Sequence, residues 1–239
     1  MNLKNSVLKY LIYSVIFISV CVVVYKSKKD INDNKSYENT SLKDQNEFIS
    51  KGINENYDSI NIDVEKSKLS WIGKKIHENH YGTIEISNGK IFIKENKVVE
   101  AFLKIDMNTI ECTDIESEVY NNKLVEHLKN QDFFEVNKHP YAEIFLNFNL
   151  IEHSDKFQLS DMQQRYDASG IIVIKGIKQS ISEDFIITYD DNMFYAHGEI
   201  EIDRTDFNIK YKSGKFFPEL ADKIILDEFS IKFELYTEK

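Results

Sequence analysis

The chain has 239 residues, of which 42% are hydrophobic, and its formal net charge is −10. Thirteen tyrosines and sixteen phenylalanines against two prolines favour a chain rich in β-strands. The negative charge, without a basic block in the folded part, argues against nucleic acid as a partner, and the two cysteines, Cys21 and Cys112, exclude a disulfide framework.

An uncharged run over residues 10–25 predicts an N-terminal signal anchor covering residues 1–25. The run is short for a membrane-spanning helix, which typically needs about 20 residues. A cleaved signal peptide and a lipoprotein signal remain alternatives, although Val20 occupies the position before Cys21 where a lipoprotein has a small residue. All three interpretations place the rest of the chain in the cell envelope, on the periplasmic or extracellular side. The anchor interpretation makes the membrane a partner.

Residues 26–61 are rich in Lys, Asn, Asp, Ser and Glu, which predicts a flexible polar tether. A flexible segment of this length has a root-mean-square reach of roughly 30–35 Å. The folded domain is then expected over residues 62–239, close to a bilayer but not necessarily in contact with it.

The folded domain shows repeated alternation of apolar and polar residues, which is typical of half-buried strands. Strands are expected at residues 68–76, 82–87, 90–94, 99–107, 142–150, 166–175, 178–189, 193–204 and 225–235. The pair Asn88 and Gly89 predicts a hairpin turn, and a second turn is expected around Gly176. No alternation of strands with helices occurs, so the predicted fold is all-β. Runs of ten residues favour a deep antiparallel barrel of about eight strands over a compact sandwich.

Small residues fall in phase with the apolar faces of two expected strands. They are Ala168 and Gly170 in one strand, and Ala196 and Gly198 in the other. If these faces point inward, the small residues leave space for a ligand. The alternative is that long aromatic side chains such as Phe148 or Phe233 fill the gap, and the pattern does not decide between the two.

Arg204 lies in phase with the apolar face of its strand, and Asp227 lies in phase with the apolar face of the last strand. A guanidinium is not buried without a partner, because the cost is large. The two side chains are therefore predicted to meet at one end of the barrel and to offer a polar terminus to a ligand. A charge bent into solvent, or a pairing of Arg204 with Asp206, is the alternative.

A short amphipathic stretch over residues 124–134 ends in Asp132, Phe133 and Phe134 and interrupts the strands. It predicts a short helix and an aromatic lid at one end of the barrel. His127 and Asp132 flank this stretch, and a polar surface pair is favoured over an acid–base dyad because no third positioned group is visible.

Other motifs give no support to catalysis. His77 and His80 have an H-x-x-H spacing without further ligands, so a zinc site is not expected. Cys112 is placed in a loop without an activating partner. No catalytic residue, metal or cofactor is predicted.

Five segments in order resemble the YceI-like family of exported, lipocalin-like barrel proteins. They are KLSWIGKK with His80-Tyr81-Gly82, LVEHLKNQDFF, HPYAEIFL, SGIIVIKGIKQSI and IDRTDFNIKYKSGKFFPELADKIILDEFSIKFEL. The resemblance covers residues 62–239 and implies an extended eight-stranded antiparallel barrel that binds a long polyisoprenoid or similar amphiphile, without enzymatic activity. Asn208 stands where the family often has glycine, and asparagine tolerates the left-handed backbone that such a turn needs.

The resulting hypothesis is a membrane-tethered protein that binds an amphiphile of the polyisoprenoid or isoprenoid quinone type for carriage, storage or sequestration. The expected ligand-binding residues are Leu103, Ile105, Phe133, Phe134, Phe148, Ile172, Phe194, Ala196, Ile200, Arg204, Phe229 and Phe233. Two rival functions stay open, a structural or interaction module with a packed barrel and an enzyme that acts on isoprenoids. The oligomeric state is also open, with a homodimer as one option.

Overall fold

The structure is a computed structural model that describes residues 57–151 and 159–239. The predicted anchor over residues 1–25 lies outside the described residues. Within the described part of the chain, no helix combines the length and the apolar character needed to cross a membrane.

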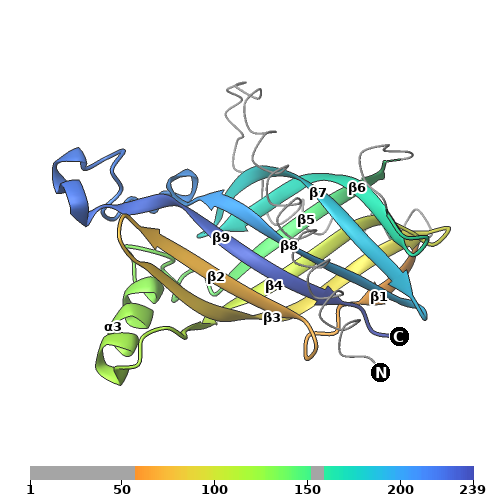
Figure 1. Cartoon of the computed structure of the whole chain (residues 1–239), viewed down its shortest axis with the longest axis horizontal. Coiled ribbons are helices and arrows are strands. Elements are labelled where there is room, and N and C mark those ends of the chain that lie inside the picture. Colours follow the sequence, from red (N-terminus) through yellow and green to blue (C-terminus); the bar gives the residue numbers. More distant parts are fainter. Residues whose placement is uncertain (1–56, 152–158) are drawn as a thin grey trace, which may run out of the picture. The chain divides into compact units, whose positions relative to one another are not determined.

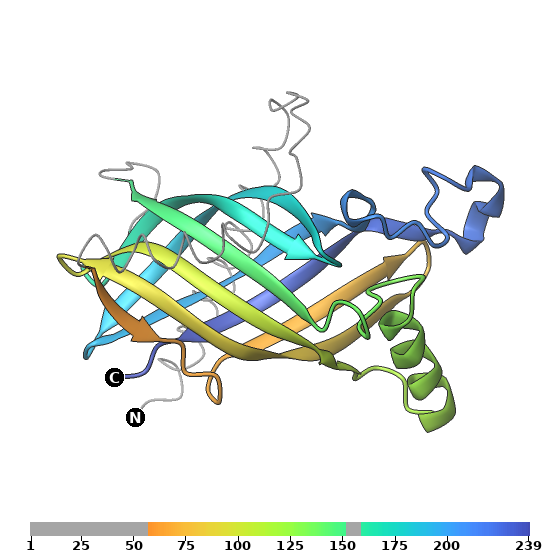
Figure 2. The same cartoon turned by 180° about the vertical axis from the view of Figure 1, so that it is seen from behind.

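The described chain forms one antiparallel sheet that closes on itself as a barrel (Figures 1 and 2). The strands are β1 (Asp58–Asn61), β2 (Lys68–Lys75), β3 (Asn79–Lys94), β4 (Lys97–Cys112), β5 (Tyr141–Leu150), β6 (Gln163–Ile174), β7 (Ile177–Asp190), β8 (Met193–Asp203) and β9 (Ile225–Tyr236). Neighbours follow the order β1-β3-β2-β9-β8-β7-β6-β5-β4, and the additional pairing of β3 with β4 closes the ring. Closure leaves an inside and an outside, so alternate residues of every strand must face a common interior.

Strands β1 and β2 share one place in the ring, on the same side of the long strand β3. β1 pairs with the second half of β3 and β2 with its first half. A turn between them is held by the bond from Ser67 N to Asp63 O, and Ile62 forms a bridge to Thr237 beyond β9. The barrel therefore has eight strand positions around its circumference, which confirms the predicted antiparallel eight-stranded barrel. Residues 58–61, assigned to the tether from sequence, are part of it.

The predicted hairpin at Asn88 and Gly89 is wrong, because β3 runs without interruption through both residues. The pairing with β4 shifts register between Ile86 and Asn88, so a β-bulge at Ser87 precedes the pair and no turn forms. A Cβ atom on Gly89 would lie 2.8 Å from side-chain atoms of Ile62 and Leu103, so glycine here permits close packing. The chain reverses instead at Glu95 and Asn96, which both have positive φ.

The other tight turns follow the expected chemistry. Lys175 and Gly176 have φ values of 52° and 71° and join β6 to β7, which confirms the turn predicted around Gly176. Asp191 and Asn192, with φ values of 48° and 62°, join β7 to β8. Two consecutive left-handed residues give a turn whose twist matches that of the flanking strands.

The inward faces agree with the alternation in the sequence for most strands, with one exception at the start of β4. The bulge there pairs Phe92 with Glu100 and Ile93 with Val98. As a result Val98, at 2% exposure, points into the barrel, and Val99, which the odd-numbered pattern had placed inside, does not.

Two long connections lie at the same end of the barrel (Figures 1 and 2). One joins β4 to β5 and contains helix α3 (Glu118–Lys129), with an acid in its first turn and Lys129 in its last, as the helix dipole favours. The helix begins six residues before the predicted stretch, and residues 130–134 form a turn. The other joins β8 to β9 and contains the 3₁₀ helices η1 (Arg204–Phe207) and η2 (Pro218–Lys223).

We expect Gly82→Ala to destabilise the barrel, whereas Gly73→Ala has little effect. A Cβ atom at Gly82 would overlap the carbonyl oxygen of Glu111 and the ring of Trp71, whereas at Gly73 it would lie 3.7 Å from that ring, an ordinary contact. Overpacking of this kind costs roughly 1–3 kcal/mol of unfolding free energy.

Urea denaturation followed by the fluorescence of Trp71 measures both variants of the full chain. Equal denaturation midpoints for the two glycine substitutions would show that the space between Gly82, Glu111 and Trp71 can accommodate a methyl group.

Candidate functional site

The barrel interior contains two apolar cavities arranged along its length. Cavity 1 has a volume of about 110 Å³ and lies toward β1 and the C-terminus, beside Ile62 and Thr237. Cavity 2 has a volume of about 120 Å³ and lies toward α3, beside Trp71 and Leu128. One enclosed water needs roughly 10–15 Å³. Each cavity therefore has the volume of on the order of ten enclosed waters.

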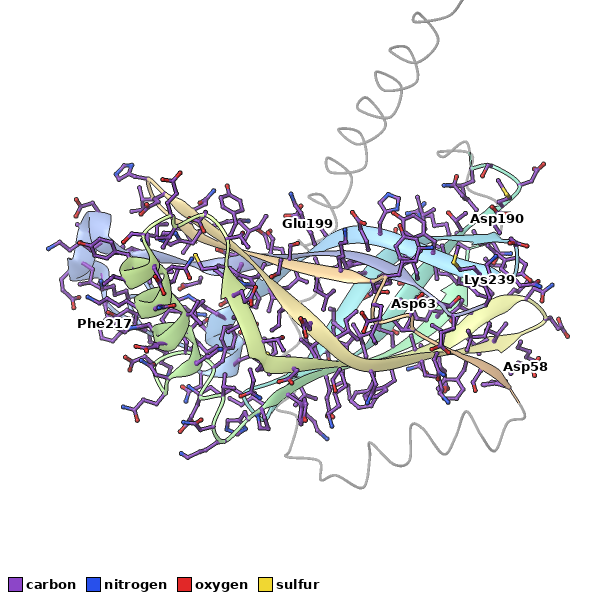
Figure 3. All side chains as sticks on the ribbon, turned by 90° about the horizontal axis from the view of Figure 1, so that it is seen from below. Asp58, Asp63, Asp190, Glu199, Phe217 and Lys239 are labelled. Carbon is purple, nitrogen blue, oxygen red and sulfur yellow. The ribbon has the colours of Figure 1, made fainter. Side chains whose placement is uncertain are left out.

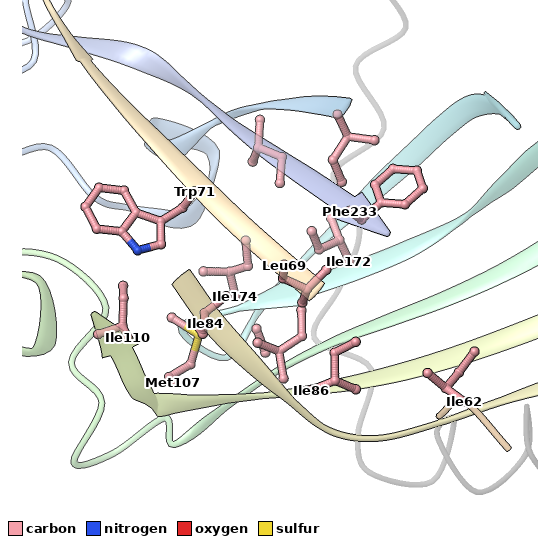
Figure 4. Close-up of a cluster of buried hydrophobic side chains, with 14 of the residues drawn as sticks. Ile62, Leu69, Trp71, Ile84, Ile86, Met107, Ile110, Ile172, Ile174 and Phe233 are labelled. Carbon is pink, nitrogen blue, oxygen red and sulfur yellow. The ribbon is translucent and has the colours of Figure 1, made fainter. Parts of the chain in front are cut away.

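A ring of branched aliphatic side chains separates the two cavities. The residues that line both of them are Leu69, Ile105, Ile144, Ile200 and Ile231. They come from β2, β4, β5, β8 and β9, and we call them the waist. Figure 4 shows Leu69 in the enclosed space, with Trp71 toward one end and Ile62 toward the other. A chain that occupies both cavities must pass the waist.

The residues predicted as ligand-binding all line one cavity or both. In cavity 1 these are Leu103, Ile105, Phe148, Phe194, Ala196, Ile200 and Phe233. In cavity 2 these are Ile105, Phe133, Phe134, Ile172, Ile200, Arg204 and Phe229. The structure thus brings the predicted set together around the two cavities of the barrel interior. Contact of these residues with a ligand stays a prediction.

The space above the small inward residues is partly filled by aromatic rings. Phe148 stands opposite Ala168 in the β5–β6 register, and its ring lies 5.5 Å from that of Phe185, centroid to centroid. Phe185 lies 5.7 Å from Phe233, whose ring in turn covers Gly198. Both alternatives left open by the sequence therefore hold in part, because rings occupy the space and a cavity remains beside them.

Several lining residues were missed from the sequence. Phe185 and Ile187 on β7 line cavity 1, but Gln179 and Glu183 share their phase and hide the apolar face of that strand. Trp71 lines cavity 2 on a short strand, where its indole N–H donates to the carbonyl of Glu111 at 2.9 Å. The sequence did contain a signal for this position. Trp71 lies two residues from Leu69, so both side chains face the same side of the strand.

Phe133 and Phe134 close the end of cavity 2 below α3. Phe133 is 8% exposed and packs against His127 and Tyr211, with centroid distances of 5.1 and 5.7 Å. Phe134 lies 6.4 Å from Phe229 across the cavity. His127 Nε2 is 3.9 Å from the carboxylate of Asp132, too far for a hydrogen bond, so the pair does not form an acid–base dyad.

Arg204 is buried at this end, and its predicted pairing with Asp227 is confirmed at 3.2 Å. The guanidinium also donates to four backbone carbonyls, at 2.9–3.0 Å. These belong to Ile209, Tyr211, Ile225 and Leu226. Burial lowers the pKa of Arg204, while the carboxylates of Asp227 and Asp203 act in the opposite direction.

These bonds use all five N–H groups of Arg204. The carbonyls of Ile209 and Tyr211 lie on the chain leaving η1, and those of Ile225 and Leu226 lie on the chain entering β9. Arg204 therefore clamps the two ends of the β8–β9 connection. Its predicted contact with the polar end of a ligand stays a prediction, and it would require one of these bonds to be exchanged.

A second polar cluster surrounds His80 outside the cavities. Its ring nitrogens lie 2.9 Å from Asp114 Oδ2 and 2.9 Å from Lys75 Nζ. Burial alone would raise the pKa of Asp114, but hydrogen bonds from the Tyr81 amide, His80 and Cys112 outweigh it and hold that pKa below its ordinary value. Cys112 is the last residue of β4, not part of a loop, and burial raises the pKa of its thiol. Within residues 57–151 and 159–239, no three His, Cys, Asp or Glu side chains are grouped to hold a metal.

Comparison with known proteins agrees with this architecture. The model of the YceI-like domain matches residues 60–237. Burkholderia cenocepacia BcnA has a similar structure, with a TM-score of 0.56 and 20% identity over 74% of this chain and 99% of BcnA. A polyisoprenoid binding domain from Saccharophagus degradans, implicated in plant cell wall breakdown, gives a TM-score of 0.53 and 16% identity over 74% of this chain and 97% of that domain. No curated protein matches the chain.

We expect Arg204→Met to destabilise the fold by about 3–5 kcal/mol, because it leaves the Asp227 carboxylate and four carbonyls without their buried partner. The other arginine of the chain supplies the control. Arg165 pairs with Asp184, which is 46% exposed, so Arg165→Met should cost about 1 kcal/mol or less.

Chemical denaturation of the two variants beside the parent chain measures the difference. A loss at Arg204 no greater than that at Arg165 would contradict the clamp.

Proposed function

The chain belongs to the YceI-like family, and from this premise we propose that it binds one amphiphilic lipid with its apolar chain inside the barrel. The observation that carries the proposal is the pair of apolar cavities, which meet at the waist and follow the barrel axis. The similarity to the polyisoprenoid binding domain from Saccharophagus degradans supports an isoprenoid or isoprenoid quinone as the class of lipid.

Affinity would come from burial of the chain. Each CH₂ group moved out of water contributes about 0.8 kcal/mol, so several such groups outweigh the loss of lipid freedom on binding. The two cavities, of about 110 and 120 Å³, limit the length of chain that the barrel can enclose. A longer chain would extend out of the barrel or displace side chains at the waist.

Binding is favoured over catalysis by the chemistry of the lining. The inward side chains are aliphatic and aromatic apart from two charged residues that line cavity 2. Arg204 is already saturated with hydrogen bonds, and Lys74 is paired with Glu201 at 2.6 Å. Such a pore solvates an apolar chain and offers no positioned acid or base along its walls. We therefore propose carriage, storage or sequestration in the cell envelope, with the chain held at the membrane by the segment predicted over residues 1–25.

The direct test is mass spectrometry of an organic extract of the purified full-length protein. We expect one lipid class with an isoprenoid chain, at a constant ratio to protein. Repeated absence of any such lipid from correctly folded protein would favour a structural module with a packed barrel, and turnover of an added isoprenoid would favour an enzyme.

We expect Ala196→Phe to remove bound lipid, because the new ring would occupy much of the about 110 Å³ of cavity 1. Loss of burial for even two or three CH₂ groups lowers affinity by at least about tenfold. His197→Phe places the same ring on the outer face of β8, where His197 is exposed, and should leave the lipid content unchanged.

Lipid-to-protein ratios of the two variants are compared by mass spectrometry after thermal unfolding has shown that each is folded. If the phenylalanine at 196 prevents folding, Ala196→Leu gives a smaller step of the same kind. Full lipid content in the folded Ala196 variants would place the ligand outside cavity 1.

A further inference from the structure

The β8–β9 connection carries an exposed basic and aromatic segment, residues 210–217, which we call the tip. Phe216 and Phe217 are adjacent and are 40% and 41% exposed. Lys210, Lys212 and Lys215 precede them, and the tip contains no acidic residue, although the chain as a whole has a net charge of −10. A compact group of lysines beside two exposed phenylalanines is the composition of a segment that lies at the surface of an anionic bilayer.

The tip is held in a defined conformation. The amides of Phe216 and Phe217 both donate to the carbonyl of Ser213, at 3.2 and 2.8 Å, and Pro218 follows at the start of η2. Lys210 Nζ lies 4.8 Å from the centroid of the Phe216 ring. The phenylalanine rings are therefore presented on a folded turn, with the entropy of ordering them already lost before any contact is made.

The lysines of the tip are available to phosphate groups. Lys210 and Lys215 are exposed and Lys212 is half-exposed. Lys215 Nζ lies 3.3 Å from the hydroxyl of Thr205, and none of the three forms an ion pair with a carboxylate of the described residues. Each lysine near an anionic lipid surface contributes about 1 kcal/mol to attraction.

The position of the tip also distinguishes the two ends of the barrel. Figure 3 shows Phe217 at the end that carries α3, and Asp58, Asp190 and Lys239 toward the opposite end. The hairpin turns at that opposite end consist of Glu95 with Asn96 and Asp191 with Asn192. The opposite end carries lysines as well as acids, since Lys94 and Lys97 flank the first turn and Lys239 pairs with Asp191. The tip differs from it by two adjacent exposed phenylalanines and by the absence of an acid within residues 210–217.

Helix α3 contributes exposed Val119 and Tyr120 at the same end, with 75% and 67% exposure. Glu116 and Glu118 precede them in the sequence, whereas Glu219 and Asp222 lie beyond the tip in η2. Like charges oppose contact with anionic lipid, so we restrict the contact to the tip.

We propose that residues 210–217 dock the α3 end of the barrel onto an anionic lipid bilayer, with Phe216 and Phe217 in the interfacial layer and the three lysines at the phosphates. Cavity 2 lies at the base of the β8–β9 connection that carries the tip, since Ile209, Ile225 and Leu226 line that cavity. Docking itself does not require a ligand. Its use in moving a lipid between bilayer and barrel rests on the function proposed above.

The test uses Phe217→Trp in the full-length protein, reconstituted in vesicles of phosphatidylcholine and phosphatidylglycerol with or without bromine on the lipid chains. Met162→Trp is the matched control, because Met162 is an exposed apolar residue beside the start of β6 at the opposite end, with 50% exposure. The emission of native Trp71 is subtracted with the parent protein.

We expect brominated chains to quench Phe217→Trp at least about threefold more strongly than Met162→Trp, because a docked tip places its rings in the interfacial layer. Lys212→Glu with Lys215→Glu in the Phe217→Trp protein should remove this excess, as should vesicles of phosphatidylcholine alone. The lysine substitutions and the uncharged vesicles each remove the charge attraction between tip and bilayer. Both leave the tryptophan probe at position 217 unchanged.

Equal quenching at positions 217 and 162 would overturn the proposal. So would an emission at 217 that depends on the protein-to-lipid ratio and not on bromine, which would identify a second copy of the chain as the occupant of this surface. Lipid content measured on the same samples keeps the two proposals separate, because a protein without cargo can still dock, and a loaded protein can fail to do so.

Discussion

Pairing of β3 with β4 is the constraint on which the rest of the structure depends. It joins the ends of the sheet, so that the main-chain groups of eight strand positions are satisfied around a ring. Once the ring is closed, alternate residues of each strand face a common interior. The pore, its apolar lining and its two ends all follow from that closure, whereas an open sheet of the same strands would have exposed this face to water.

The interior is neither solid nor empty, because side chains of unequal size face one another. Rings from Phe148, Phe185 and Phe233 extend over the small residues on β6 and β8, and branched aliphatic residues at the waist narrow the middle. Packing of this kind leaves voids that no polar group lines, and such voids stay dry until an apolar group fills them. The shape of the interior is therefore set by the alternation of large and small side chains and not by polar groups.

Sequence patterning was sufficient where a strand has one apolar face and no irregularity. The even positions of β5, from Ala142 to Phe148, were placed correctly for this reason, and Arg204 could be paired with Asp227 by phase alone. Patterning failed where the backbone departs from strict alternation. A bulge moved Val98 inward in place of Val99, and Asn88 with Gly89 permits a turn without requiring one. The four carbonyls that Arg204 binds could not be foreseen, because backbone acceptors leave no trace in the order of side chains.

Arg204 has a consequence for how the fold could diversify. Because one side chain fastens both ends of the β8–β9 connection to the barrel, the residues between those ends are mechanically insulated from the strands. Insertions or exchanges within residues 212–224 would then change what the barrel presents to its surroundings while the register of β8 and β9 is preserved. The clamp makes this connection a site where a different segment could be installed without redesign of the pore.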